Sequence, residues 1–395
     1  MLFTSDHNLQ QWKRIALHLA TIVAVALAPA AGSAQDQTRP EPGNPEAAMA
    51  QGTTRTETTT TLERRSVATQ AEREAKPYQT REGRLRAKPL DWNSTLGKRG
   101  PAVEKAPVEG KPESSEPGRP NPNAKREAQR LHPEEWNNMK KYPPQSRLDL
   151  DQNGPPRLVL VGTADVFSQY CEGCLVPNID YPEVTVGKLF LNGGFCSASV
   201  VSGNNVIVTA AHCCYDRGNR RFIGGWVFAP GYNNGNAPYG TFNWSSATVL
   251  NSWINNGDVA SDVCTIKLAP DGANRGVTFY TGWLGRSWNF PSDQSHHALG
   301  YPGNLGGGNT LELCTSESFS PNAACGGSGI LNTGCSMTFG SSGGPWVRSY
   351  RGNNWVNSVV HGYDSQSCTG TFGQTFNGAR FTSGNIVTVC NAAGC

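Results

Sequence analysis

The chain changes character near residue 157, and this break limits what it can fold into. None of the 12 cysteines lies before the break, whereas 17 of the 26 prolines and 23 of the 34 lysines and arginines do. Seven of the ten tryptophans follow it. Only the second part therefore has the apolar and cross-linking residues for a core, and its length suits one large all-β domain at 157–395.

The first 34 residues have the pattern of a secretion signal. Lys13 and Arg14 precede an apolar run at 15–31, and Gly-Ser-Ala at 32–34 offers small residues for cleavage. The alternative, a membrane anchor, is disfavoured because the run contains a histidine and a proline and is shorter than the roughly 20 apolar residues of a spanning helix. We expect a secreted or periplasmic protein that has no membrane contact after the signal is removed. In such a compartment, 12 cysteines favour disulfides.

Residues 35–156 are rich in proline and charge and poor in aromatic side chains. This composition predicts a mostly disordered segment, because little apolar surface is available to offset the entropy lost on ordering. Local helix signals occur at 53–65 and from Pro133 onward. The segment is interpreted as a pro-segment that is removed or that restrains the domain, with a simple tether as the alternative. Arg147-Leu148 and Arg157-Leu158 are candidate maturation bonds.

Charge gives little indication of partners. The formal net charge is +3, and residues 157–395 alone carry 11 basic and 12 acidic side chains. Neither value indicates nucleic acid or a membrane surface as a partner.

A histidine and a serine stand in motifs that suit hydrolysis. Residues 189–213 have the pattern of strand, turn and strand and end in Thr-Ala-Ala-His-Cys, so His212 lies just beyond a strand end. Imidazole can accept and return a proton near neutral pH. Ser342 lies in Gly-Ser-Ser-Gly-Gly-Pro at 340–345, and its hydroxyl needs such a base to become a nucleophile. The backbone N–H groups of Gly340 and Ser342 can face one point in so small a turn, where an oxyanion would form.

Two aspartates compete for the role of the carboxylate that orients His212. Asp262 precedes the apolar run Val-Cys-Thr-Ile-Lys-Leu, whose buried character suits a fixed carboxylate. Asp258 follows the turn Asn-Asn-Gly, where aspartate commonly caps a loop. We select Asp262.

These motifs resemble those of the chymotrypsin-like serine proteases. That family carries its histidine in TAAHC, its aspartate at the start of a strand such as DIALIKL, and its nucleophile in GDSGGP. The resemblance implies a His212, Asp262 and Ser342 triad and two antiparallel six-stranded β-barrels. It also implies a disulfide between Cys196 and Cys213 that closes the histidine loop.

Two details refine the resemblance. Gly-Tyr-Pro-Gly at 300–303 is similar to a motif of the glutamyl endopeptidase branch. Ser341 stands where family zymogens use an aspartate to bind a new N-terminal ammonium. That ion pair cannot form here, so the oxyanion hole is either preformed or organised differently.

The residues of the substrate pocket leave its specificity open. Ser336 stands six residues before Ser342, where trypsins place an aspartate, so cleavage after Lys or Arg is poorly supported. His361 lies on the later strand of the pocket. By the resemblance it either meets a substrate carboxylate or hydrogen-bonds Asp262. Acidic preference and small or apolar preference both stay open.

The remaining cysteines are interpreted as structural. Cys171 and Cys174 favour a local disulfide over a redox motif, because no βαβ pattern surrounds them. A zinc site built on His296 and His297 is the weaker alternative, and we expect no metal and no cofactor. The pairing of the other cysteines cannot be derived from spacing, although a disulfide of Cys314 with Cys325 or Cys335 would fix the approach to the serine turn.

The sequence thus predicts a secreted serine endopeptidase of class EC 3.4.21, made as a zymogen. It would hydrolyse protein or peptide substrates through an acyl-enzyme on Ser342. The alternative is a catalytically inactive homologue that acts as a binding or adhesion module.

Overall fold

The computed structural model describes residues 55–58, 61–66, 76–91, 93–97, 110–141, 167–175, 178–364, 366–369 and 375–395. The predicted secretion signal at 1–34 and the candidate maturation bonds lie outside these residues. No helix within them is long and apolar enough to cross a membrane.

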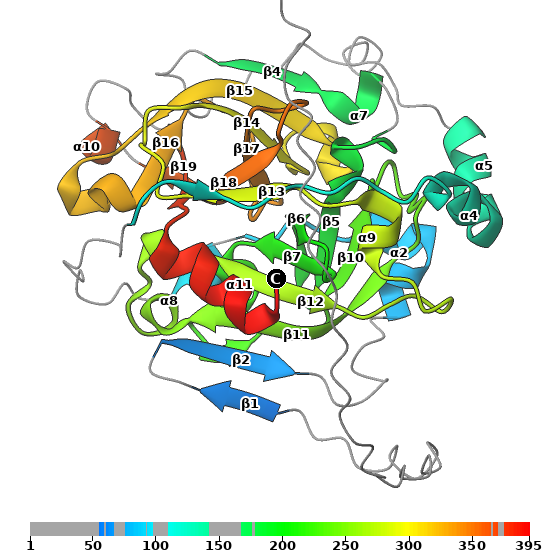
Figure 1. The fold of residues 1–395 in the computed structure, drawn as a ribbon, viewed down its shortest axis with the longest axis horizontal. Helices are drawn as coiled ribbons and strands as arrows, with labels where there is room; N and C mark the ends of the chain where they lie inside the picture. The colour runs from blue at the N-terminus through cyan, green and yellow to red at the C-terminus, as the bar shows by residue number, and fades with distance from the viewer. Residues whose placement is uncertain are drawn as a thin grey trace, which may run out of the picture. The chain divides into compact units, whose positions relative to one another are not determined.

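The first barrel has six antiparallel strands (Figure 1). Their order is β11-β10-β5-β6-β7-β12, and the pairing of β11 with β12 closes the barrel. The strands are β5 (Val186–Leu191), β6 (Gly194–Ser202), β7 (Val206–Thr209), β10 (Val227–Pro230), β11 (Phe242–Leu250) and β12 (Cys264–Leu268).

The second barrel repeats this plan with the order β17-β14-β15-β16-β19-β18, closed by the pairing of β17 with β18. Its strands are β14 (Ser295–Gly300), β15 (Glu312–Phe319), β16 (Ile330–Thr333), β17 (Pro345–Arg348), β18 (Trp355–Asp364) and β19 (Thr375–Arg380). The predicted fold of two six-stranded antiparallel β-barrels is therefore confirmed.

Short elements connect and flank the barrels. They are β4 (Ser168–Cys171), α7 (Glu172–Leu175), η4 (Glu183–Thr185), η5 (Ala211–Cys213), β8 (Tyr215–Asp216), β9 (Arg221–Phe222), α8 (Asn251–Asn256), η6 (Val259–Ser261), α9 (Val277–Thr281), β13 (Gly285–Trp288), η7 (Gly306–Gly308), η8 (Ala323–Cys325), η9 (Gly327–Gly329), α10 (Gln366–Thr369), η11 (Ser383–Val387) and α11 (Thr388–Ala393).

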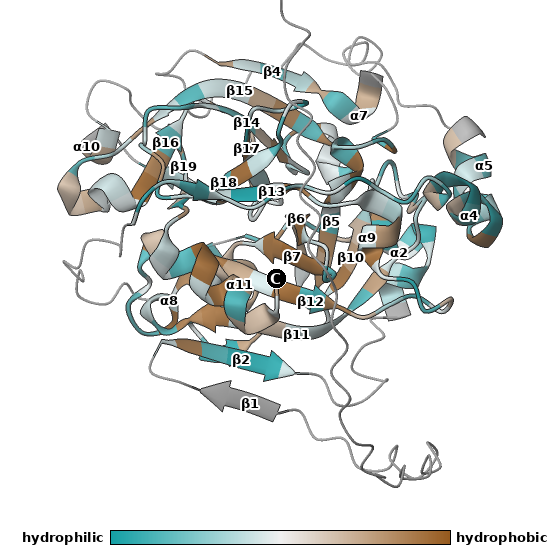
Figure 2. Cartoon of the chain, viewed as in Figure 1, coloured by the Kyte–Doolittle hydropathy of each residue, from teal (hydrophilic) through white to brown (hydrophobic). Residues whose placement is uncertain are grey.

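The strands form because apolar residues recur along them and are buried. Every residue of β5, β6 and β7 is buried. Tryptophans 226, 244, 253 and 346 are almost fully buried, in agreement with the prediction that the second part of the chain supplies the core. Hydrophobic residues gather on the barrel strands, whereas β2 and α4 are largely hydrophilic (Figure 2).

The described parts of 35–156 differ from the expectation of disorder, since they form elements that pack on the barrels. The elements are β1 (Arg55–Thr58), β2 (Leu62–Ser66), η2 (Lys76–Gln79), α2 (Arg81–Arg86), α3 (Asn93–Leu96), β3 (Glu113–Ser114), α4 (Ala124–Leu131) and α5 (Pro133–Lys141). The hairpin β1–β2 pairs with β11, and β3 pairs with β13 (Figure 1). The helix start at Pro133 is confirmed, whereas the helix signal at 53–65 is overridden by strand pairing.

All 12 cysteines form six disulfides. The pairs are Cys171–Cys174, Cys196–Cys213, Cys214–Cys264, Cys314–Cys335, Cys325–Cys368 and Cys390–Cys395. Of the two partners considered for Cys314, the structure pairs it with Cys335, which lies seven residues before Ser342.

Candidate active site

The histidine loop is fixed from two sides. His212 lies in η5 directly after β7, and the disulfide Cys196–Cys213 ties this turn to β6. The indole N–H of Trp226 donates to the Cys213 carbonyl at 2.9 Å. His212 is fully buried. Closing this loop removes alternative positions that the ring would otherwise sample.

Asp262 holds the backbone and the ring of His212 together. One carboxylate oxygen accepts from the His212 amide N–H at 2.8 Å, and the other lies 2.7 Å from Nδ1. Burial alone would raise the pKa of Asp262, but the nearby His212 and His361 outweigh it and hold the pKa below its usual range. An ionised Asp262 requires Nδ1 of His212 to carry its proton, which leaves Nε2 as the base.

Asp258 has the capping role that its turn predicted. Its carboxylate accepts from the Ala260 amide at 3.1 Å and from the Ser261 hydroxyl at 2.7 Å, at the start of η6. This leaves Asp262 beside His212.

His361 also contacts Asp262. It lies on β18 of the second barrel, and its Nδ1 is 2.5 Å from the Asp262 carboxylate. Of the two roles left open by the sequence, the geometry favours the hydrogen bond to Asp262. Because Asp262 belongs to the first barrel, this bond joins the two barrels at the site.

Ser342 reaches the histidine loop from the second barrel. The Ser197 amide on β6 donates to the Ser342 carbonyl at 2.8 Å, so the serine turn lies against the strand that carries Cys196. Ser342 is fully buried. Within the described residues, neither the Ser342 hydroxyl nor His212 Nε2 has a hydrogen-bond partner. Hydrogen bonds between catalytic groups are often long in enzymes without substrate and tighten when it binds.

Hydrogen bonds fix the orientation of two peptide groups in the serine turn. The Gly303 amide donates to the Phe339 carbonyl at 2.7 Å, and the Gly344 amide donates to the Ser341 carbonyl at 2.8 Å. In a trans peptide the N–H points away from the C=O, so these bonds direct the amides of Gly340 and Ser342 to the other side. Neither amide donates a hydrogen bond within the described part of the chain. Gly340 has φ +93°, where glycine is favoured.

Ser341 is satisfied locally. It is fully buried, and its hydroxyl donates to the Thr338 carbonyl at 2.7 Å. The Ser197 hydroxyl adds a link, since it accepts from the Tyr301 amide and donates to the Gly340 carbonyl, both at 2.9 Å. The turn is thus held without a buried ion pair, and Tyr301 of the Gly-Tyr-Pro-Gly motif contributes directly.

The predicted pocket residue Ser336 lies against a residue that the sequence did not single out. Its hydroxyl donates to the side-chain oxygen of Gln169 at 2.5 Å. Gln169 lies on β4, which pairs with β15. No local signal marks Gln169, because its position depends on pairing across about 145 residues of chain. Ser336 therefore contacts Gln169, whereas His361 contacts Asp262, so the two predicted pocket residues do not share this partner.

Trp253 is a second neighbour of the site that motif analysis could not find. Its ring centroid lies 6.4 Å from that of His212 and 6.0 Å from that of His361. It is fully buried on α8 and shields the two histidines from water.

Donor atoms of His212, Asp262 and His361 lie within 4.8 Å of one another, as a metal site requires. However, both imidazoles direct Nδ1 at the carboxylate, so these nitrogens donate protons and offer no lone pair to a cation. The group fits a carboxylate that accepts hydrogen bonds from two imidazoles. His296 and His297 belong to no potential ligand cluster among the described residues.

Paired six-stranded barrels with these side chains where they meet are the architecture of the chymotrypsin-like serine proteases. Residues 182–377 match the family model described as Trypsin. The chain belongs to this family over that segment, which is about half of its length.

Solved structures give similar chains. The protease Anisep from Arthrobacter nicotinovorans is 27% identical, with a TM-score of 0.47, and 53% of this chain and 95% of that chain are covered. A thermostable serine protease AL20 from an extremophilic microorganism is 28% identical, with a TM-score of 0.47 and coverages of 53% and 97%. A Glu endopeptidase in complex with MPD is 17% identical, with a TM-score of 0.49 and coverages of 60% and 100%. No curated protein matches the chain.

Proposed function

We propose that this protein is an exported serine endopeptidase that cleaves peptide bonds through an acyl-enzyme on Ser342. The observation that carries the proposal is the buried hydrogen-bonded chain from His361 through Asp262 to His212, next to a glycine-rich serine turn. The pairing of all 12 cysteines supports export, because disulfides persist in oxidising compartments.

The mechanism follows from two atoms that have no hydrogen-bond partner within the described residues, the Ser342 hydroxyl oxygen and His212 Nε2. Nε2 of His212 takes the proton of the Ser342 hydroxyl as the oxygen attacks the substrate carbonyl carbon. The carbonyl oxygen becomes an anion that the Gly340 and Ser342 amides stabilise, and each such donor typically contributes about 3 to 4 kcal/mol to lowering the barrier. His212 then gives the proton to the leaving amine as the peptide bond breaks. Water, activated by the same nitrogen, hydrolyses the ester and regenerates Ser342.

Asp262 and His361 act as positioning residues in this proposal. The carboxylate fixes the tautomer of His212 and stabilises the imidazolium as it forms. His361 donates the second side-chain hydrogen bond to that carboxylate, which favours this role over recognition of a substrate carboxylate. Acidic and small or apolar side chains before the cut bond both remain candidate specificities, and a peptide library with mass readout separates them.

Replacing the nucleophile tests the proposal. We expect Ser342→Ala to lower peptide hydrolysis by roughly 10⁶-fold and to abolish labelling by a fluorophosphonate, with unchanged circular dichroism. The neighbouring variant Ser341→Ala is the matched control and should keep its label, because that hydroxyl only donates to Thr338. Mass spectrometry locates the label before and after limited proteolysis of the full chain. Labelling that persists in Ser342→Ala would reject Ser342 as the nucleophile, whereas a wild type that neither labels nor hydrolyses peptides after limited proteolysis would favour the inactive binding module.

A further inference from the structure

We propose that residues 76–97 of the N-terminal segment form an inhibitory plug, docked across the candidate active site of the same chain. The inference rests on the proposed function, because it assigns to these residues the control of access to Ser342. Three sets of contacts carry it: a β-bridge at residues 88–90, the helix α3, and a buried polar anchor at Arg84.

The starting observation is that the reactive groups are covered. Ser342 and His212 are each 0% exposed, and the Ser342 hydroxyl oxygen and His212 Nε2 are both buried. A protease must present its nucleophile to a polypeptide, so this arrangement is closed to substrate. Residues of the N-terminal segment border the site and are the proposed source of this cover.

Residues 88–90 form a single extended β-bridge at the edge of the site. The Leu90 amide donates to the Phe195 carbonyl at 2.9 Å, and the Phe195 amide donates to the Lys88 carbonyl at 2.9 Å. Both backbone groups of Phe195 are therefore taken, in a parallel bridge centred on Pro89. Phe195 borders the serine turn, since a Cβ atom added to Gly340 would lie 2.5 Å from its ring. This bridge consequently occupies backbone that an extended peptide would need.

Pro89 reaches the wall of the predicted oxyanion hole. A Cβ atom added to Gly303 would lie 2.8 Å from Pro89 Cγ and 3.2 Å from the Phe339 carbonyl oxygen. The proline ring thus lies beside the peptide that carries the Gly340 amide. Because proline has a fixed φ and no N–H, it is a rigid and poorly reactive occupant of this position.

Helix α3 covers the histidine side. The Arg217 amide donates to the Thr95 carbonyl at 3.0 Å, and the Arg217 guanidinium donates to the Leu96 carbonyl. Leu96 and Gly97 line a cavity of about 180 Å³ together with Trp253 and His361. The N-terminal segment therefore borders both the serine side and the histidine side of the site.

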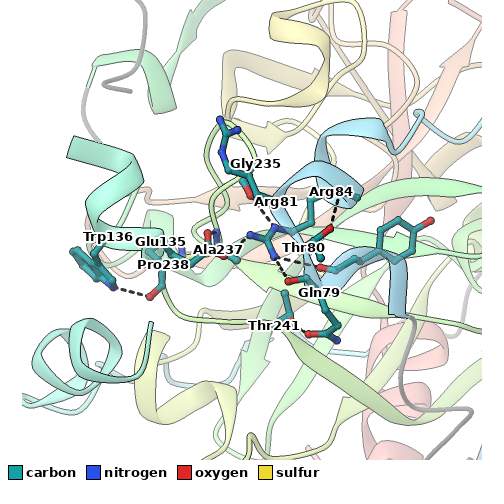
Figure 3. A network of polar contacts seen from close by, with 12 residues as sticks. Gln79, Thr80, Arg81, Arg84, Glu135, Trp136, Gly235, Ala237, Pro238 and Thr241 are labelled. Atoms are coloured by element: carbon teal, nitrogen blue, oxygen red, sulfur yellow. Dashed lines mark hydrogen bonds and ion pairs between the residues drawn. The ribbon is translucent and has the colours of Figure 1, made fainter. Parts of the chain in front are cut away.

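A buried arginine anchors this segment to the first barrel. Arg84 is 1% exposed, and its Nε donates to the Gly235 carbonyl at 2.8 Å (Figure 3). Its guanidinium also pairs with Glu135 of α5 at 2.5 Å and donates to the carbonyls of Tyr78 and Gln79. Glu135 in turn accepts from the Ala237 amide at 2.8 Å. Breaking such a buried pair from one side is costly because the other charge stays behind.

These contacts are noncovalent, and the residues of the N-terminal segment that make them, Glu135 included, all lie before residue 142. A cut at Arg147-Leu148 or Arg157-Leu158 would leave all of them in place. Activation would therefore need a second event that removes residues 88–90 from Phe195, such as a cut within the plug or loss of the anchor.

The test compares labelling rates of Ser342 by a fluorophosphonate in the full chain. Leu90 is 6% exposed, so Leu90→Asp places a carboxylate in an apolar contact and should raise the labelling rate about tenfold or more. Leu85→Asp is the matched control, because Leu85 is exposed on α2. Its labelling rate should equal that of the wild type. A synthetic peptide of residues 76–97, added to Leu90→Asp, should slow labelling again.

A second variant acts from the anchor. Glu135→Ala should also raise the labelling rate, although Glu135 contacts none of the residues proposed for catalysis. Equal rates in wild type, Leu90→Asp and Glu135→Ala, with the label on Ser342, would overturn the plug and leave the proposed nucleophile standing. No label on Ser342 in Leu90→Asp, with circular dichroism showing a folded chain, would overturn the plug together with the proposed function.

Discussion

The first barrel buries Trp226 completely in an apolar core, whereas the N-terminal segment attaches to the same barrel through the charged side chain of Arg84 as well as through the apolar side chains of Leu90 and Trp136. Trp226 packs edge-on against Trp244, with ring centroids 4.6 Å apart. Arg84 is surrounded by backbone carbonyls and one carboxylate. Apolar burial cannot be removed without exposing a core, but polar contacts can be exchanged for water. The difference suits a permanent scaffold that carries a removable cover.

The largest expected effects come from replacing one tryptophan of the barrel core and one tryptophan of the N-terminal segment. We expect Trp226→Ala to lower the free energy of unfolding by about 3 to 5 kcal/mol, because it leaves a cavity in the core. Trp136 on α5 is 7% exposed and donates to the Pro238 carbonyl at 2.7 Å. Trp136→Ala should release α5 while the barrels keep their stability. Chemical denaturation followed by near-ultraviolet circular dichroism checks the first effect, and hydrogen exchange of α5 checks the second. An equal loss of unfolding free energy in Trp226→Ala and Trp136→Ala would show that α5 and the first barrel unfold as one cooperative unit.

The buried Lys188 gives the next largest effect, through pH. Its ammonium donates to the Gly308 carbonyl at 2.8 Å and lies 3.7 Å from the centroid of the Phe195 ring. Burial lowers the pKa of Lys188 to about 7 from 10.5. Between these values the unfolded chain binds the extra proton, so this lysine makes folding more favourable as the pH rises from 7 and less favourable as it falls.

Lys188→Met removes this proton linkage. Between about pH 7 and pH 9, the wild type should gain roughly 2 kcal/mol of unfolding free energy relative to the variant. Urea denaturation at both pH values measures the difference. A difference in unfolding free energy between wild type and variant that is the same at both pH values would contradict the lowered pKa of Lys188 in the folded state.

The smallest expected effect on the free energy of unfolding comes from a surface ion pair of the N-terminal segment. Lys125 on α4 lies 2.5 Å from Asp180, with side chains 47% and 68% exposed. Lys125→Ala should change the unfolding free energy by less than about 0.5 kcal/mol, because water screens the pair. Thermal denaturation at low and high salt checks this. A larger effect would mean that exposed charges, and not only Arg84, hold the segment.

The lesson for prediction lies in particular residues. His212, Asp262 and Ser342 were chosen from motifs, because each motif combines a reactive group with the backbone that it needs. The resemblance that these motifs carry likewise implied two barrels, which the structure confirms. Trp253 and Gln169 were missed because they reach the site by tertiary packing. His361 had two possible partners until the second barrel placed it 2.5 Å from Asp262.

The sequence by itself determined the family resemblance and the β architecture, since strand alternation, glycine turns and short motifs are local properties of the chain. Only the tertiary structure decided the partners of the eight cysteines outside the pairs Cys171–Cys174 and Cys196–Cys213, the contact of His361 with Asp262 and the order of the described parts of the N-terminal segment. Its low apolar content predicted disorder, but Arg84 finds carbonyls and a carboxylate up to 151 residues away. A polar segment can be ordered by a surface that supplies matching hydrogen bonds, and that surface exists only after the barrels have folded.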